Sequence, residues 1–295
     1  MLVIDVHEHV IPRQGFLHPR MKETICTAAE LVAIMDREGI DRMVALPLSS
    51  PETYHFVQSV EEVFEACDQF PDRFIKFGNA DPRLEVNATE PYDFKPILEY
   101  YRSLGARGVG EATANLAWDD PRYQNLLRAT DELGLPFLFH LATHEFNTYG
   151  IVTEPGLGGL ERALKQYPRI QFIGHSPGWW SEVGGNPSRA DLDGYPKGKV
   201  APGGRVPELL RTYPNIWGDL SAGSGYNALA RDPEWAYGFL EEFQDRLMMG
   251  LDICIPSNDR CELLGFLRRA HQEKRISPRA FAKIMGENAC RLLEL

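Results

Sequence analysis

The chain has 295 residues, of which 43% are hydrophobic and 25% are charged, a composition typical of an ordinary globular protein. Its formal net charge of −11 argues against a nucleic-acid partner, because non-specific nucleic-acid binding needs a basic face. The five cysteines form no C-x-x-C pair and are odd in number, and no apolar run approaches the length of a membrane span. We therefore expect a cytoplasmic protein with no disulfide framework and no membrane partner.

Strand-like and helix-like segments alternate along the whole chain. The first strand candidate, residues 2–9, opens with the apolar run Leu2-Val3-Ile4. The other strand candidates are residues 41–48, 74–80, 106–112, 136–141, 170–175, 215–221 and 246–252. The helix candidates are residues 28–37, 57–70, 96–104, 120–133, 159–167, 206–213, 234–244 and 261–272. Eight strands, each followed by a helix, predict an α/β fold, a single-domain (β/α)8 TIM barrel that covers residues 1–295.

The first strand ends in the sequence Asp5-Val6-His7-Glu8-His9. Successive side chains of a strand point to opposite faces, so His7 and His9 share one face. Two imidazoles placed in this way can hold one metal ion; the alternative is two unconnected polar residues at a strand end. Asp5 lies on the same face one pleat deeper, where a hydrogen bond could fix the tautomer of a ligand.

Later strand candidates end in the same way. His140, His175 and Asp252 each close an apolar run, and Glu111 closes the fourth strand candidate. A single histidine in a strand is commonly a core or surface residue, but the repetition at several strand ends favours one shared site. Four nitrogen ligands with one or two carboxylates suit zinc, manganese or iron.

These residues resemble the amidohydrolase superfamily, and within it the amidohydrolase-related branch of metal-dependent hydrolases and decarboxylases. The family pattern is H-x-H after strand 1, His after strands 5 and 6, and Asp after strand 8. The matching residues here are His7, His9, His140, His175 and Asp252. The likeness covers nearly the whole chain and includes the closing run from Gly286 to Leu292. It implies one or two divalent ions, zinc first, with manganese or iron as alternatives.

The resemblance also implies roles for individual residues. Asp252 would contact the metal and carry a proton as the acid/base, and His175 would polarise the substrate. In related TatD-like deoxyribonucleases a Glu in a Gly-Glu context bridges two metals, and Gly110-Glu111 matches that context. Alternatively, Glu111 orients a ligand, pairs with Arg107 or meets a substrate hydroxyl.

One segment, from Pro177 to Gly204, breaks the alternation. It contains seven glycines and four prolines and directly follows His175. We interpret it as a long substrate-covering loop after strand 6, with a surface or homo-oligomer contact as the alternative. Trp179 and Trp180 are its strongest candidates for substrate contact, with one of them expected to line the pocket.

Other polar and aromatic residues stand near the expected mouth of the barrel. His144 follows the strand-5 histidine by four residues, and binds substrate if that strand continues; otherwise it is a solvated loop residue. Arg13, if it points inward, predicts a carboxylate substrate. Tyr226 would suit a planar or sugar-like substrate. Asp219 and Ser221 close the seventh strand candidate, and one of them is expected to face the pocket.

The leading functional interpretation is a metal-dependent hydrolase of a small-molecule ester, lactone or amide that uses metal-activated water. The alternative is a metal-dependent non-oxidative decarboxylase, or a hydratase, of an unsaturated or aromatic carboxylic acid. A barrel that binds metal and ligand without turnover is a third hypothesis, disfavoured because every strand-end ligand is present. Metal content would help to separate them: two ions bridged by Glu111 favour hydrolysis, and one ion favours decarboxylation.

Overall fold

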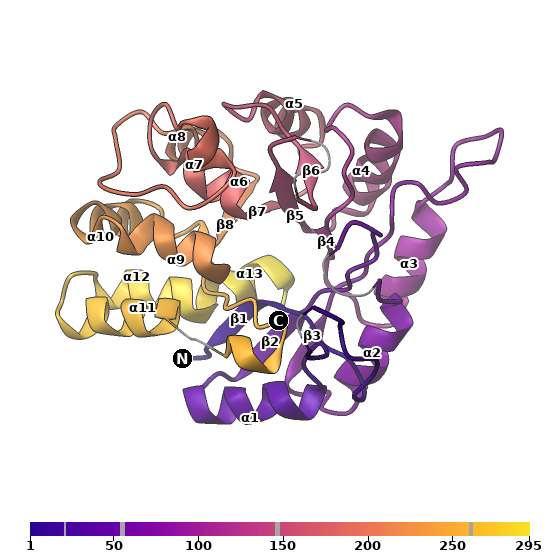
Figure 1. Ribbon diagram of the computed structural model, residues 1–295, viewed down its shortest axis with the longest axis horizontal. Helices are drawn as coiled ribbons and strands as arrows, with labels where there is room; N and C mark the ends of the chain where they lie inside the picture. Colours follow the sequence, from indigo (N-terminus) through magenta and orange to yellow (C-terminus); the bar gives the residue numbers. More distant parts are fainter. Residues whose placement is uncertain (21, 54–56, 145–147, 260–261) are drawn as a thin grey trace.

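The strands form a ring of parallel strands surrounded by helices (Figure 1). The computed structural model describes residues 1–295 except 21, 54–56, 145–147 and 260–261. The strands are β1 (Ile4–Glu8), β2 (Arg42–Ala45), β3 (Phe74–Lys76), β4 (Val109–Ala112), β5 (Phe137–Ala142), β6 (Ile151–Val152), β7 (Phe172–His175), β8 (Ile216–Asp219) and β9 (Leu247–Met248). Eight of them match the predicted strands in order, and β6 is an additional short strand that pairs with β5.

The strands follow the chain order around the barrel. One sheet has the order β1-β2-β3 and the other the order β4-β5-β7-β8-β9. Between β3 and β4, the amide of Gly110 donates to the carbonyl of Gly78 at 2.9 Å. Between β9 and β1, the amide of Val6 donates to the carbonyl of Met249 at 3.0 Å. These backbone bonds join the two sheets at both edges, and the fold is the predicted TIM barrel.

Eight of the helices on the outside match the predicted helices to within three residues at each end. Thr27 forms a capping box with Glu30 at the start of α1, and Gly39 ends α1 in the left-handed conformation that glycine tolerates. The α-helices are α1 (Ala28–Glu38), α2 (Val60–Asp68), α3 (Lys95–Ser103), α4 (Pro121–Leu133), α5 (Gly158–Gln166), α6 (Pro177–Trp180), α7 (Arg189–Leu192), α8 (Arg205–Thr212), α9 (Ala222–Ala230), α10 (Pro233–Glu242), α11 (Glu262–Gln272), α12 (Pro278–Ala282) and α13 (Asn288–Leu293). Helices α6, α7, α9, α12 and α13 lie outside the predicted helix ranges. The helix predicted from residue 261 is confirmed from Glu262 onward, and Cys261 lies outside the described residues.

The alternation of side chains along each strand separates two cores. Leu138 belongs to the core inside the barrel, whereas Phe137 and Phe139 belong to the core between strands and helices. His140, one residue further along β5, therefore faces inward above Leu138. The same alternation places Ile173 and His175 of β7 on the inner side.

The segment from Pro177 to Gly204 is structured where it leaves β7. It contains α6, a 3₁₀ turn at Ser181–Val183 and α7. The hydroxyl of Ser181 donates to the carbonyls of Pro177 and Asp191, which ties α6 to α7. The predicted long loop after the sixth barrel strand therefore contains short helices, and its role as a substrate cover stays a prediction.

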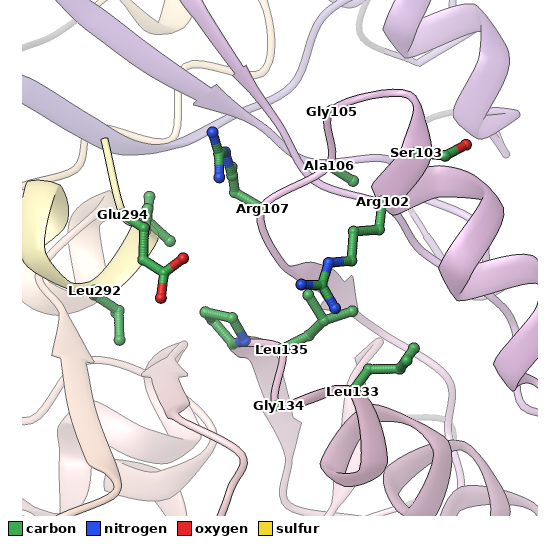
Figure 2. Close-up of a pocket in the computed structure, with 12 residues that line it drawn as sticks. Arg102, Ser103, Gly105, Ala106, Arg107, Leu133, Gly134, Leu135, Leu292 and Glu294 are labelled. Carbon is green, nitrogen blue, oxygen red and sulfur yellow. The ribbon is translucent and has the colours of Figure 1, made fainter.

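The opposite end of the barrel carries a pocket of about 380 Å³ (Figure 2). Arg107 before β4, Pro136 before β5 and Glu294 near the C-terminus line it. It lies at the amino ends of the strands, the end that TIM barrels do not use for catalysis. Among the described helices, none is long and apolar enough to cross a bilayer.

Candidate metal centre

Six polar side chains converge at the carboxyl ends of the strands. They come from β1, β4, β5, β7 and the turns after β1 and β9, and they are His7, His9, Glu111, His140, His175 and Asp252. Five are almost completely buried, whereas the Asp252 side chain is 15% exposed. Solvent, and therefore a substrate, reaches the cluster on the Asp252 side.

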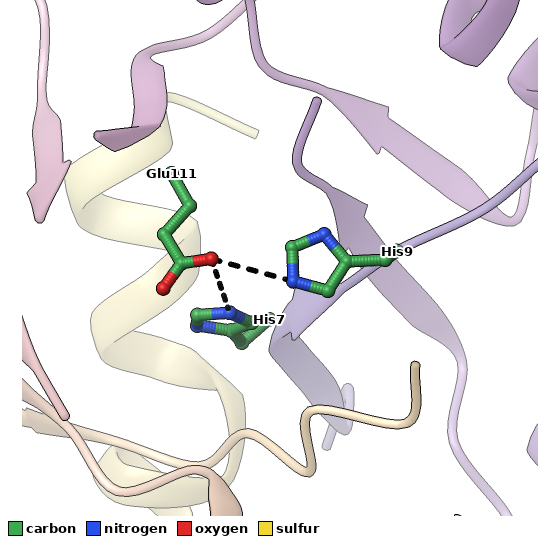
Figure 3. Close-up of side chains that lie close together, drawn as sticks. All are labelled: His7, His9 and Glu111. Carbon is green, nitrogen blue, oxygen red and sulfur yellow. Dashed lines mark ion pairs between the residues drawn. The ribbon is translucent and has the colours of Figure 1, made fainter. Parts of the chain in front are cut away.

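Glu111 lies among the imidazoles (Figure 3). Its Oε2 is 3.4 Å from Nε2 of His9 and 3.7 Å from Nε2 of His7. Its Oε1 accepts a hydrogen bond from Nδ1 of His140 at 2.7 Å and is 3.9 Å from Nε2 of His175. A single carboxylate thus reaches all four imidazoles.

The carboxylate of Asp252 also lies close to three of these imidazoles. Its Oδ1 is 3.7 Å from Nε2 of His7 and 3.6 Å from Nε2 of His9, and its Oδ2 is 3.7 Å from Nε2 of His175. The backbone of Asp252 has a φ of 60°, a conformation that costs a non-glycine residue energy and that is often found at functional sites.

Neighbouring groups hold the rings so that Nε2 faces the centre. Nδ1 of His9 donates to the carbonyl of Leu46 at 2.8 Å, and Nδ1 of His7 donates to Oδ2 of Asp219 at 2.7 Å. Nδ1 of His175 lies 2.9 Å from the hydroxyl of Ser221, which itself donates to Asp219. Because a metal-bound histidine normally donates its other nitrogen in this way, the arrangement fits a metal centre.

In this cluster the nearby imidazoles offset the effect of burial on the pKa of both carboxylates. Burial alone would raise the pKa of Glu111, but the hydrogen bond from His140 and the nearby imidazoles of His7 and His9 hold it well below its usual range. Burial would also raise the pKa of Asp252, and the nearby imidazoles of His7, His175 and His9 lower it instead. Burial lowers the pKa of His140. Both carboxylates are therefore ionised and available as ligands at neutral pH.

The distances match a divalent transition metal. Two ligand atoms that each lie about 2.1 Å from a tetrahedral ion are separated by about 3.4 Å. The contacts from Glu111 to His9 and from Asp252 to His9 measure 3.4 and 3.6 Å. Nε2 of His7 is buried and has no hydrogen-bond partner among the described residues, which is costly unless a ligand occupies its lone pair. The residues present fit a metal ion with imidazole and carboxylate ligands.

Two residues expected to bind substrate lie apart from this cluster. Arg13 is exposed and pairs with Glu65 of α2 at 3.3 Å, so it does not point inward, and the carboxylate substrate that depended on this condition does not follow. His144 is half-exposed, and its Nδ1 lies 2.6 Å from a guanidinium nitrogen of Arg189 on α7. The described segment beyond β5 bends away at Thr143, so His144 does not continue the strand.

The tryptophans of α6 do not line the site. Trp179 is fully buried against Phe139, and its indole lies where a side chain on Gly174 would point, on the outer face of β7. Trp180 lies in the same way over Gly218 of β8. The substrate contact predicted for Trp179 is therefore wrong. Tyr226 lies on α9 and packs partly buried against the outer core, and its role stays a prediction.

Three residues near the cluster were not assigned to it from the sequence. Tyr149 packs against the ring of His140, with ring centroids 4.3 Å apart. Cys254 donates its thiol to Oδ1 of Asp252 at 3.1 Å. Tyr195 on the long segment lies over Gly223 at the start of α9. Cys254 had a signal in the sequence, since it follows Asp252 by two residues and so can share its face.

Comparison with known proteins gives a family and a fold. The family model described as amidohydrolase matches residues 4–295. No curated protein matches the chain.

Solved structures resemble the chain over its whole length. A protein from Acinetobacter baumannii, described as a probable 2-pyrone-4,6-dicarboxylic acid hydrolase with citric acid bound, has 17% identity and a TM-score of 0.60, with 100% of each chain covered. The 5-carboxyvanillate decarboxylase of Sphingomonas paucimobilis has 17% identity and a TM-score of 0.60, with 100% of this chain and 99% of that chain covered. A zinc-bound amidohydrolase from Burkholderia multivorans has 14% identity and a TM-score of 0.64, with 100% of each chain covered. At these identities the structures support the fold.

Proposed function

The chain belongs to the amidohydrolase family, and we propose that it is a metal-dependent hydrolase of a small-molecule ester, lactone or amide. The observation that supports the proposal is the convergence of His7, His9, Glu111, His140, His175 and Asp252 at the carboxyl ends of the strands. A divalent ion held there, zinc in the first instance, would act as a Lewis acid toward a carbonyl group or a water molecule.

Asp252 is the proposed acid/base. Its carboxylate is ionised, and it is the most exposed member of the cluster, so it can accept a proton from water and pass it to a leaving group. The amide of Asp252 donates to the carbonyl of His7 at 3.0 Å, which fixes the backbone that presents this carboxylate.

His175 is the proposed substrate-polarising residue. The contact with Ser221 holds Nδ1, which leaves Nε2 facing Asp252 at 3.7 Å and open to a substrate oxygen. Glu111 reaches all four imidazoles, and this central position supports a role as a metal ligand rather than a partner of Arg107.

Decarboxylation or hydration of an unsaturated or aromatic acid is the second candidate function. The same ligands would orient the substrate, and Asp252 would deliver a proton to carbon. Two of the similar structures support this second function, because they are the 5-carboxyvanillate decarboxylase and a 2,6-dihydroxybenzoate decarboxylase from Rhizobium. The Rhizobium enzyme has 15% identity and a TM-score of 0.55, with 99% of this chain and 98% of that chain covered.

Metal analysis together with two assays tests the proposal. Purified protein is analysed for metal, stripped with a chelator and reloaded with zinc. It is then given 2-pyrone-4,6-dicarboxylate, simple lactones and esters, 5-carboxyvanillate and 2,6-dihydroxybenzoate. We expect hydrolysis that depends on metal and falls by about two to four orders of magnitude in Asp252→Asn. Release of carbon dioxide without hydrolysis would select the second function, and full activity of metal-free protein would contradict both.

A further inference from the structure

Cys254 places a sulfur atom at the edge of the metal centre. Its Sγ is 3.1 Å from Oδ1 of Asp252. The ligand atoms of His9, Asp252 and Cys254 all lie within 4.8 Å of one another, as do those of His7, His9 and Glu111. The thiol therefore belongs to the same constellation as the residues already described.

The backbone around Cys254 is fixed from both sides. The amide of Ile253 donates to Oε2 of Glu8 at 2.9 Å, and Ile253 itself is fully buried. The carbonyl of Cys254 accepts from the amide of Cys26 at 3.0 Å. With Ile253 held in this way, the ligand atoms of Asp252 and Cys254 both lie within 4.8 Å of that of His9.

A second observation concerns the ring nitrogen of His7 that faces Asp252. Nε2 of His7 is buried and makes no hydrogen bond within the part of the chain that the structure describes, although it lies within 3.7 Å of both Glu111 and Asp252. Nε2 of His7 thus faces Asp252 in the turn after β9, which is the turn that carries Cys254.

We propose that Cys254 is a metal ligand, and that His9, Asp252 and Cys254 form a nitrogen–oxygen–sulfur face of the centre. The inference rests on the metal-dependent function proposed above. On binding, the bond between sulfur and its proton is replaced by a bond to the ion, and the proton leaves to solvent. Since thiolate is a soft ligand, this face makes the centre prefer zinc, cadmium or cobalt over manganese.

The competing explanation is that the thiol only donates a hydrogen bond that positions Asp252. Serine retains a hydroxyl donor at the same place but is a poor ligand for soft ions. Cys254→Ser therefore preserves the positioning role and removes the ligand role. Cys290→Ser is the matched control, because Cys290 is a free, partly buried cysteine on α13, packed against the core inside the barrel.

The test is the absorption spectrum of cobalt-loaded protein. Protein stripped of metal is loaded with Co²⁺, its cobalt content is measured, and the near-ultraviolet region is examined for a thiolate-to-cobalt charge-transfer band. We expect this band in the unchanged protein and in Cys290→Ser. We expect it to be lost in Cys254→Ser, which retains bound cobalt and an unchanged circular dichroism spectrum.

A competition titration supplies a second readout. Cadmium affinity is expected to fall by at least about tenfold in Cys254→Ser, while manganese affinity changes little. Cys254→Ala provides a second variant if the serine protein does not fold.

Cobalt bound without the charge-transfer band, or a band that survives in Cys254→Ser, would overturn the assignment while leaving the metal centre intact. Failure to bind any metal would overturn the proposed function and this inference together.

Discussion

Asp219 determines which nitrogen of His7 faces the metal centre, so Asp219→Asn is expected to weaken metal binding. Oδ2 of Asp219 accepts from Nδ1 of His7 at 2.7 Å, and Oδ1 accepts from the amide of Ser221 at 2.9 Å. An asparagine has only one oxygen for these two donors. If its oxygen serves Ser221, its NH₂ group faces His7, and the imidazole proton must move to Nε2, where it blocks the metal.

The expected magnitude follows from the lost interaction. Asp219 is fully buried, and although burial raises a carboxyl pKa, the imidazoles of His7 and His175 beside it hold the pKa of Asp219 well below its usual range. A hydrogen bond to such a charged group contributes about 1.5–3 kcal/mol. Since about 1.4 kcal/mol is a factor of ten, metal affinity should fall roughly 10- to 150-fold.

The assay is a competition titration of zinc against a chromophoric chelator at neutral pH. Asp245→Asn is the control, since it removes the same charge from an exposed carboxylate that pairs with Lys283 at 2.6 Å. An affinity in Asp219→Asn equal to that of the control would refute the argument that Asp219 sets the tautomer of His7.

Further substitutions test the packing and the buried charges. Trp179→Ala should destabilise the protein by about 3–5 kcal/mol in urea unfolding, because it empties a core position; a loss below about 1 kcal/mol would restore the idea of a substrate-facing indole. Gly174→Ala should cost about 1–3 kcal/mol, since the new methyl group would lie 2.6 Å from the Trp179 ring. Gly238→Ala on α10, with nothing within 4 Å, should be neutral or stabilising by the same measurement, and equal effects of the two changes would be inconsistent with the packing described. Burial raises the pKa of Asp5 to about 7, so the folded protein retains a proton that the unfolded chain releases above about pH 4. Unfolding free energies at fixed metal should show the unchanged protein losing stability relative to Asp5→Asn as the pH rises from about 4 to about 7, and a constant difference would contradict the assignment.

The strands and the ligands could be predicted because both follow from a local pattern. A parallel strand buried on both faces is an apolar run, and its carboxyl end is where the chain reaches the site. His140 and His175 end such runs, and the structure places them in one cluster with Glu111. The structure also confirms the expectation that Asp219 or Ser221 faces the pocket, since both contact His175.

The position of the tryptophans could not be predicted by the same reasoning. An extended backbone after His175 would have sent Trp179 and Trp180 to opposite sides. Ser176 instead accepts from the amide of Trp179 and starts a helical turn, so both indoles fall on the outer face. The spaces they fill exist only because Gly174 and Gly218 lack side chains, and that is a relation between distant parts of the chain.

The orientations of Arg13 and His144 could not be predicted for a different reason. Each lies close in sequence to a strand end, but the direction of a loop side chain depends on partners that the local sequence does not specify. For Arg13 that partner is Glu65, and for His144 it includes Arg189 on α7. Sequence proximity to a barrel mouth therefore predicts the neighbourhood of a residue better than its orientation.

The indole of Trp180 connects the long segment to the catalytic end through a single residue. Its Nε1 donates to the carbonyl of Asp219 at 2.8 Å, while the side chain of Asp219 holds His7 and lies 3.2 Å from Nδ1 of His175. The first part of the segment is thus fixed to the residue that holds both rings, so a change in α6 would act on His7 and His175 through Asp219.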